Sequence, residues 1–330
     1  MTAKPSPQIS VAMAVYNNAP FVPEAIESIL NQSFGDFEFL IVDDGSTDGS
    51  GAVIDRYAAQ DQRIRVLRQA NAGFVASLNR LIAEAATPWI ARMDGDDVAL
   101  PDRLAQQWAW VKEHPDHGVL GTGLQEIDEQ GRPLPTDRPT PRTHEDFAAR
   151  LSTGPLAHHN SVIMRKDLVM QAGGYRPAFR HCEDYDLWLR LYSMTKMANL
   201  PDKLMQYRRY GGQVSARYRA EQLVNAAVAY EAYQERSAGR VDPTAGLATL
   251  PPLAQIDALF GRPVAKAICA RVAPALLYSE STLTGEGFDL IVDAAKDGVA
   301  MEGAWRTVAR LVLMGQPTRA VRLAAALVRR

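Results

Sequence analysis

The sequence has few cysteines, almost no net charge and no long apolar run. Its two cysteines, Cys182 and Cys269, cannot form a disulfide framework, and no C-x-x-C pair offers a cysteine-type zinc site. Lysine and arginine total 36 against 38 aspartate and glutamate residues, so no overall positive field favours nucleic acid. The chain lacks an apolar run of about 18 residues, and its start lacks the apolar core of a signal peptide. We therefore expect a cytoplasmic protein that neither spans a membrane nor binds nucleic acid.

The 330 residues are enough for one large domain or two ordinary ones, and the sequence texture favours two regions. Short apolar runs alternate with helical patterns in the first region. Strands are expected at 9–15, 37–42, 64–67, 89–93, 119–121 and 161–164, with helices at 103–113 and 185–194. This alternation predicts a mostly parallel α/β sheet with helices on both faces. After a linker-like stretch that begins near Gly239, the patterns are helical only, so we place the domains at 1–235 and 236–330.

Acidic residues follow two of the expected strands. Asp43 and Asp44 follow the strand at 37–42, and they should lie at the ligand-binding edge of a parallel sheet. A helix-capping loop explains the same residues, because Asp, Ser and Gly all favour turns. A calcium loop is disfavoured, since Asp55 stands where an EF-hand requires glutamate and a strand precedes the loop.

The second acidic cluster follows the strand at 89–93. Asp94, Asp96 and Asp97 repel one another, and a divalent cation would relieve that repulsion. Mg²⁺ or Mn²⁺ typically binds through one or two carboxylates while substrate phosphates complete its shell. An isolated Asp-x-Asp is more often an exposed acidic turn, so this motif alone does not establish a metal site.

A third acidic cluster begins the helix expected at 185–194. Glu183, Asp184 and Asp186 are ordinary first-turn residues of a helix, where acids complement the helix dipole. A carboxylate at such a position also suits a general base.

The C-terminal residues 300–330 carry six arginines against the single acid Glu302. This pattern fits either amphipathic helices that lie on an anionic membrane or a helical hairpin packed on the rest of the protein.

Taken together, these segments resemble the family 2 glycosyltransferases of the GT-A fold, which are inverting, nucleotide-sugar-dependent enzymes. The similarity covers roughly residues 8–215. It is carried by VAMAVYN at 11–17, LNQSFGDFEFLIVDDGSTDGS at 30–50, NAGFVASLN at 71–79, MDGDDVALPDRL at 93–104, HNSVIMRKD at 159–167, GGYRPAFRHCEDYDLWLRL at 173–191 and YRRYGGQVS at 207–215.

The resemblance implies a role for each matching position. Residues that bind the nucleotide are expected to be Ala14, Tyr16, Asn17, Asp43, Asp44, Asp94 and Gly95. Within this set, Asp44 corresponds to the acid that contacts uracil and Asp94 to the acid that touches the ribose. Asp96 would coordinate the Mn²⁺ or Mg²⁺ that bridges the diphosphate, and Asp184 matches the catalytic base. His159 and Glu183 are candidate contacts of the acceptor, although a structural role suits His159 equally well.

Two positions depart from the family pattern. Tyr210 stands where many members have a histidine that helps to bind metal or diphosphate. Either phosphates and water complete the coordination of the metal, or Arg208 or Arg209 supplies charge to the diphosphate. Ala14 replaces a residue that often carries a hydroxyl, although a backbone contact would survive this change.

The resemblance implies a metal-dependent inverting glycosyltransferase that uses a nucleotide-sugar donor, with UDP as the expected carrier. Its acceptor would be a hydroxyl of a glycan or lipid-linked molecule in bacterial surface polysaccharide synthesis. A lipid-linked acceptor would make peripheral membrane contact through the C-terminal helices useful. The alternative is an inactive nucleotide-sugar-binding regulator of the same fold. Tyr210 supports that alternative, whereas the intact Asp94, Asp96 and Asp184 favour catalysis. Hydride transfer is disfavoured because no G-x-G-x-x-G occurs.

Overall fold

The computed structural model describes the chain except for residues 1–6, 136–138, 212–217, 286 and 329–330. The end of the motif at 207–215 and the last two arginines therefore lie outside the described residues. The chain divides into two compact units, one formed by residues 1–176 and 187–210 and the other by 177–186 and 211–330. The predicted domain boundary between residues 235 and 236 stays a prediction.

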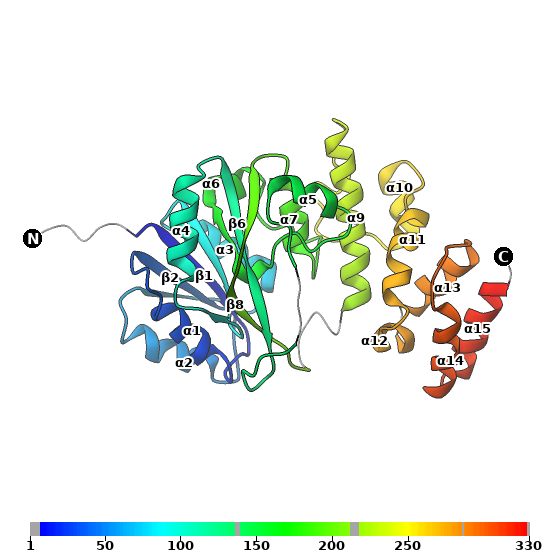
Figure 1. Cartoon of the computed structure of the whole chain (residues 1–330), viewed down its shortest axis with the longest axis horizontal. Helices are drawn as coiled ribbons and strands as arrows, with labels where there is room; N and C mark the ends of the chain where they lie inside the picture. Colours follow the sequence, from blue (N-terminus) through cyan, green and yellow to red (C-terminus); the bar gives the residue numbers. More distant parts are fainter. Residues whose placement is uncertain (1–6, 136–138, 212–217, 286, 329–330) are drawn as a thin grey trace, which may run out of the picture. The chain divides into compact units, whose positions relative to one another are not determined.

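An eight-stranded sheet forms the centre of the first unit, with the strand order β3-β2-β1-β4-β7-β6-β8-β5 (Figure 1). The strands are β1 Ile9–Val15, β2 Phe37–Asp43, β3 Ile64–Arg68, β4 Trp89–Asp94, β5 Val98–Ala99, β6 His117–Ile127, β7 Ile163–Arg165 and β8 Lys196–Arg208. β7 pairs antiparallel with β4 and β6, β5 pairs antiparallel with β8, and the other neighbours are parallel. The expected mostly parallel α/β sheet is thus confirmed.

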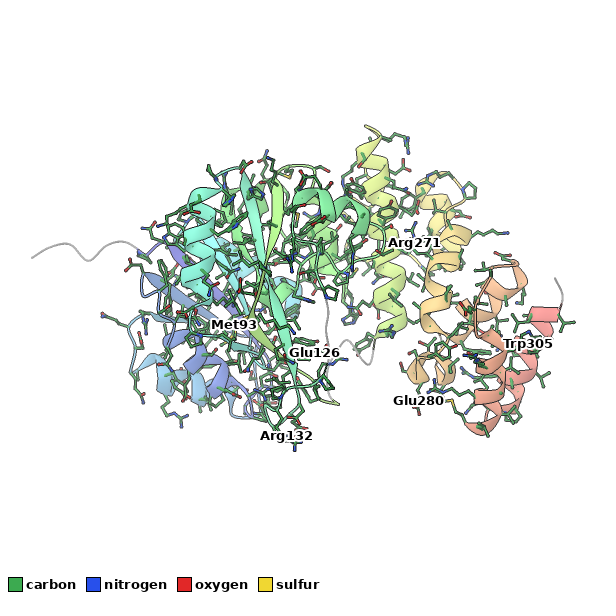
Figure 2. The ribbon with its side chains drawn as sticks, in the orientation of Figure 1. Met93, Glu126, Arg132, Arg271, Glu280 and Trp305 are labelled. Carbon is green, nitrogen blue, oxygen red and sulfur yellow. The ribbon has the colours of Figure 1, made fainter. Side chains whose placement is uncertain are left out.

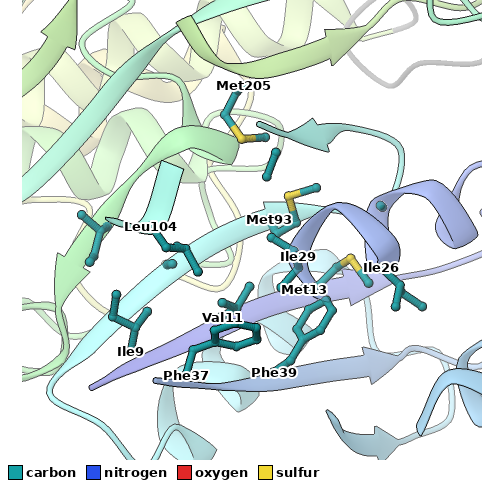
Figure 3. Close-up of a cluster of buried hydrophobic side chains, with 14 of the residues drawn as sticks. Ile9, Val11, Met13, Ile26, Ile29, Phe37, Phe39, Met93, Leu104 and Met205 are labelled. Atoms are coloured by element: carbon teal, nitrogen blue, oxygen red, sulfur yellow. The ribbon is translucent and has the colours of Figure 1, made fainter. Parts of the chain in front are cut away.

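Helices cover the sheet. They pack through apolar faces formed by residues three or four positions apart. The helical segments of this unit are α1 Val22–Leu30, α2 Ser50–Ala58, α3 Phe74–Glu84, α4 Arg103–Glu113, α5 His144–Arg150, the 3₁₀ turn η1 His159–Ser161, α6 Lys166–Gln171 and the last part of α7 Glu183–Leu191. All seven residues of β1 are buried, which requires cover on both faces of the strand. Figure 3 shows Val11 and Met13 of β1 beside Phe37 and Phe39 of β2, in the cluster that also contains Ile26 of α1.

The expected strands agree with the observed ones most closely in the first half of the unit. The strand predicted at 161–164 is wrong at its start, because His159–Ser161 form a 3₁₀ turn and β7 begins only at Ile163. Sequence reasoning also missed β8, whose exposed middle contains Pro201 and Asp202, and whose pairing with β6 has shifts in register. The alternating sequence pattern of a strand is weak where its hydrogen bonding to the neighbouring strand is irregular.

The second unit is helical, as the sequence predicted for its C-terminal part. Its helices are the start of α7, then α9 Arg219–Ser237, α10 Ile256–Phe260, α11 Ala265–Leu276, α12 Glu280–Thr284, α13 Phe288–Lys296, α14 Ala304–Leu313 and α15 Pro317–Val328, with a 3₁₀ turn, η2, at Leu253–Gln255. The Arg262 guanidinium forms ion pairs with Glu231 and Glu235 of α9, with N···O distances of 2.9 and 2.8 Å. Among the described residues, no helix is long and apolar enough to cross a membrane.

Candidate active site

The carboxyl ends of four neighbouring strands lie at one edge of the sheet. The register pairs Ala14 of β1 with Asp94 of β4, Val15 of β1 with Asp43 of β2, and Asp43 with Arg68 of β3. Parallel strands with this register bring the acids that follow β2 and β4 to the same edge. The first two acidic clusters of the sequence therefore belong to one site.

Asp43 and Asp44 both organise loops at this edge. Asp43 is buried, and its carboxylate binds Arg68 Nη1 at 2.6 Å and the backbone N–H of Ser46 at 3.0 Å. The Asp44 carboxylate is 3% exposed and accepts three hydrogen bonds, from Gln69 Nε2 at 2.6 Å and from the backbone N–H groups of Ala72 and Gly73 at 2.8 and 2.9 Å. Asp44 thus fixes the loop before α3.

The loop after β1 is bound to the loop after β2. Asn17 has a positive φ of 53°, its N–H donates to Ser46 Oγ at 3.1 Å, and its side-chain oxygen accepts from the Thr47 N–H at 2.8 Å. The N–H of Ala19 donates to Asp48 Oδ2 at 2.9 Å. Tyr16 lies beside these bonds with a side chain that is 51% exposed. The two loops therefore form one cross-linked rim with an exposed aromatic ring.

Asp94 is paired with an arginine that the sequence analysis did not single out. Arg92 is 1% exposed, and its Nη2 donates to Asp94 Oδ1. Residues two apart on a strand point to the same face, so the Arg-x-Asp spacing was the signal that would have found this pair. The next residue, Gly95, packs tightly, because a Cβ there would lie 3.0 Å from the Asn18 amide nitrogen and 3.3 Å from Val15.

Asp96 accepts a hydrogen bond from the tyrosine that replaces the family histidine. The Tyr210 hydroxyl lies 2.9 Å from Asp96 Oδ2, and its ring packs on Phe21 with the centroids 5.0 Å apart. Burial and the negative charge of Asp94 raise the pKa of Asp96 to about 6. Burial and the same acidic cluster also raise the pKa of Tyr210, so this hydroxyl remains a hydrogen-bond donor at neutral pH.

Asp97, which follows Asp96 in the chain, and Arg208 are buried residues that bond to each other. Asp97 accepts from Asn160 Nδ2 at 2.6 Å and from the Arg208 N–H at 2.9 Å, and burial raises its pKa well above the ordinary value. The Arg208 guanidinium donates to the Asp96 carbonyl at 2.9 Å, to the Glu129 carbonyl at 3.0 Å, and to Glu24. Neither role was foreseen, because β8 itself was not predicted.

The two arginines proposed for the diphosphate therefore differ in their surroundings. Arg208 is 2% exposed and bound to backbone carbonyls, which makes it a structural residue in this geometry. Arg209 has a side chain that is 39% exposed, lies 3.9 Å from Glu126 and packs over the Tyr207 ring. Of the two, Arg209 is the better candidate for a ligand contact.

His159 lies in a cluster of aromatic side chains. Its Nε2 is 2.7 Å from the Tyr175 hydroxyl, and its ring is 6.2 Å from those of Phe74 and Trp188. Burial and the positive charge of Arg92 lower the pKa of His159 well below its usual range. The imidazole is therefore neutral at physiological pH.

Asp184 and Glu183 occupy the first turn of α7 in the second unit, as predicted for a helix start. The Asp184 carboxylate accepts from the Tyr185 N–H at 2.7 Å, whereas Glu183 is 8% exposed. Burial and the neighbouring acids raise the pKa of the Cys182 thiol well above its ordinary value, which disfavours the reactive thiolate. The base role of Asp184 stays a prediction.

The described residues contain no group of three or more His, Cys, Asp or Glu side chains able to hold a metal on their own. A cation bound at this site would therefore need ligands from the substrate, which is the usual arrangement for Mg²⁺ on diphosphates. Burial and, after it, the negative charge of Asp94 raise the pKa of Asp96, and a cation would offset that negative charge. The donor set at Asp96 thus fits a metal that arrives with a phosphorylated ligand.

The chain is similar in sequence to known glycosyltransferases. The family model described as glycosyl transferase family 2 matches residues 10–171. EpsE of Bacillus subtilis (strain 168), which is named a glycosyltransferase, is 34% identical over 231 residues, covering 68% of this chain and 82% of EpsE. The amylovoran biosynthesis glycosyltransferase AmsE of Erwinia amylovora is 32% identical, covering 63% of this chain and 79% of AmsE.

Two kinds of solved structure share the fold. S. aureus TarS 1–349 in complex with UDP-GlcNAc matches with a TM-score of 0.59 and 17% identity, covering 97% of this chain and 90% of that fragment. The chain spans 55% of the longer TarS structure. The mannosyltransferase PcManGT from Pyrobaculum calidifontis, in complex with GDP-Man and Mn²⁺, matches with a TM-score of 0.55 and 18% identity, covering 98% of this chain and 87% of PcManGT.

These solved structures support the fold alone, whereas the sequence relatives and the family model establish the family. The extent and identity of the match to EpsE, together with the family model, show that this chain is a glycosyltransferase and belongs to glycosyl transferase family 2.

Proposed function

We propose that this glycosyltransferase transfers a sugar from a nucleotide-sugar donor to a hydroxyl of a glycan or lipid-linked acceptor, with inversion at the anomeric carbon. The observation that carries this proposal is the alignment of Asp43, Asp94 and the loop of Asp96 at one edge of the sheet. That edge is where doubly wound α/β sheets bind nucleotides. The exposed Tyr16 and the cross-linked loops after β1 and β2 would form the side of the site that holds the base.

Asp96 is the residue that we assign to the metal. Mn²⁺ or Mg²⁺ bound there would supply Lewis-acid stabilisation of the charge that develops on the departing diphosphate. Tyr210 donates to Asp96 at 2.9 Å and would orient this carboxylate. The PcManGT structure contains Mn²⁺ with its nucleotide sugar, which supports the choice of ion.

Asp184 is the residue that we assign as catalytic base. The acceptor hydroxyl oxygen forms a bond to the anomeric carbon while the bond from that carbon to the diphosphate oxygen breaks. The hydroxyl proton passes to the Asp184 carboxylate, and the nucleoside diphosphate leaves with the electron pair of the broken bond. Proton removal by a positioned carboxylate suits a reaction in which the nucleophile is a weakly acidic alcohol.

The family resemblance favours UDP as the carrier, and the name of a sequence relative favours a polysaccharide as the product. TarS was solved with UDP-GlcNAc, and AmsE is named for amylovoran biosynthesis. We propose a UDP-linked donor, a cytoplasmic reaction and an acceptor from bacterial surface polysaccharide synthesis.

A thermal-shift panel tests the donor assignment. UDP-GlcNAc, UDP-glucose and GDP-mannose, each with and without Mn²⁺, should include one ligand that raises the melting temperature only when Mn²⁺ is present, because a ligand of the native state stabilises it. A matched panel of the free sugars is the control. If no nucleotide sugar shifts the melting temperature, the proposed function is wrong, whereas binding without transfer to any acceptor would favour the regulator.

The C-terminal helices carry a surface that suits an anionic membrane. α14 exposes Trp305, Val312 and Leu313 at helical spacing, and α15 exposes Val321 and Val328. Figure 2 shows Trp305 at the edge of the helical unit. Four arginines and one glutamate lie within residues 300–328, so the net side-chain charge there is positive. Apolar side chains combined with arginines are typical of helices that lie in a membrane interface.

Liposome flotation tests this membrane contact. The protein should float with vesicles that contain phosphatidylglycerol at low salt and should remain unbound with phosphatidylcholine alone, because anionic lipid attracts the arginines. Leu313→Glu, at a position that is 89% exposed, should lower the bound fraction without altering the fold. Complete recovery of the wild-type protein in the unbound fraction would contradict the proposal.

A further inference from the structure

One buried side chain of the site has hydrogen-bond donors that the fold does not use. Arg92 is 1% exposed, and its Nη2 is occupied by Asp94. Its Nε and Nη1 are buried and have no hydrogen-bond partner among the described residues. Buried polar groups are rarely left unpaired, and an unpaired guanidinium nitrogen is especially costly, so these two donors indicate an acceptor that the protein chain does not provide.

A second unpaired donor lies in the same part of the first unit. Trp188 is 1% exposed, and its Nε1 has no partner within the described part of the chain. Its ring lies 6.2 Å from that of His159, which in turn lies 6.2 Å from Phe74. Arg92 packs over the Phe74 ring at 5.2 Å. The aromatic cluster of Phe74, His159 and Trp188 thus links the unpaired donors of Arg92 and Trp188.

The chemistry of this cluster selects its ligand. It presents N–H donors and aromatic rings, with Phe74 42% exposed, and the neutral His159 adds no charge. Small-molecule sites combine apolar and aromatic walls with a few placed polar groups in this way. A sugar ring offers both an apolar face and several oxygens that accept hydrogen bonds, and it matches this combination.

The cluster is connected to a different acid from the one assigned to the metal. Asp96 contacts Tyr210, which packs on Phe21, whereas Asp94 contacts Arg92, which packs over Phe74 of the aromatic cluster. On the proposed function, the diphosphate is held at Asp96. The diphosphate joins the ribose, which Asp94 is expected to contact, to the transferred sugar, and the sugar is the part of the donor to which no side chain has yet been assigned.

We propose that Arg92 and Trp188 bind the sugar ring of the donor, with Arg92 Nε and Nη1 and Trp188 Nε1 donating hydrogen bonds to its oxygens and Phe74 contacting its apolar face. This inference rests on the proposed function. It makes these residues determinants of which sugar is transferred, separately from the residues that bind the nucleotide.

Calorimetry with matched ligands tests the inference. Trp188→Phe removes one N–H while keeping an aromatic ring, and Arg92→Met removes the guanidinium while keeping an unbranched side chain. Each variant should lower the affinity for the donor identified by the panel, UDP-GlcNAc or another of its nucleotide sugars, at least 5-fold. Each should change the affinity for the corresponding free nucleoside diphosphate less than 2-fold. Trp305→Phe, at an exposed position of α14, is the control and should change neither affinity.

The comparison of the two ligands distinguishes sugar binding from a structural role. A structural role would lower both affinities together, and that result would overturn the inference. Unchanged affinity for the nucleotide sugar in both variants would also overturn it while leaving the proposed function intact. If the wild-type protein binds no nucleotide sugar, the proposed function and this inference both fail.

Discussion

Asp184→Asn is expected to lower the turnover number about 10²- to 10⁴-fold, which is the usual contribution of a general base. The amide has nearly the shape of the carboxylate but cannot take the proton from the acceptor hydroxyl. Donor affinity should stay within 2-fold of the wild-type value, because the change affects the transition state and not the nucleotide site. Steady-state kinetics and calorimetry with the nucleotide sugar measure the two quantities.

The same Asp-to-Asn substitution at a surface position separates the loss of the catalytic base from a general loss of negative charge. Asp167→Asn removes a carboxylate that pairs with Arg165 on the surface, and it should leave turnover unchanged. A fully active Asp184→Asn enzyme would contradict the assignment of the base. Equal loss of turnover and of donor affinity would instead indicate that Asp184 supports the donor site.

Asp44→Ala is expected to lower the free energy of unfolding by about 1.5 to 3 kcal/mol, because the backbone N–H groups of Ala72 and Gly73 lose their charged acceptor and hydrogen bonds to charged groups contribute on this scale. The loop before α3 should also loosen, so affinity for UDP should fall at least 10-fold if Asp44 contacts the base. Chemical denaturation and calorimetry at 25 °C check the two results.

Asp48→Ala is the control for this prediction, because Asp48 is an exposed acid of the same loop that accepts from the Ala19 N–H. It should cost less stability than the Asp44 exchange. A loss below about 1 kcal/mol in Asp44→Ala would show that the three hydrogen bonds do not hold the loop. Unchanged affinity for UDP would contradict the predicted contact with the base.

The sequence was most informative where local patterns coincide with the fold. The apolar runs of β1, β2, β3 and β4 are short, and those of β1, β2 and β4 are largely buried, so the positions of these strands were predictable to within about a residue. Acids directly after β2 and β4 then had to meet at one edge, because parallel strands place their carboxyl ends together. These elements account for the predicted nucleotide side of the site.

The parts that escaped prediction depend on contacts between distant segments. Asp97 is held by Asn160 and by Arg208, which lie 63 and 111 residues away, and no local pattern announces such pairings. Arg92 looked like an ordinary charged residue in an apolar strand, and only the packing of Phe74 and Asp94 around it shows why it is there. The sequence therefore located the acids but not the side chains that position them.

Tyr210 illustrates how the structure alters a sequence-based argument. Its position suggested a lost metal or diphosphate ligand, which supported an inactive regulator. Its hydroxyl instead donates to Asp96 at 2.9 Å, so the position still acts on the proposed metal-binding carboxylate. A hydrogen bond to the carboxylate favours its charged form, which is the form that binds a cation.

The central claim is that Asp96 binds a divalent cation together with the diphosphate of the donor. Calorimetric titration of UDP into the wild-type protein and Asp96→Ala, each with and without Mn²⁺, tests it most directly. The wild-type protein should bind UDP at least 10-fold more tightly with Mn²⁺, and this gain should disappear in Asp96→Ala. An equal gain from Mn²⁺ in both proteins, or none in the wild-type protein, would contradict the account.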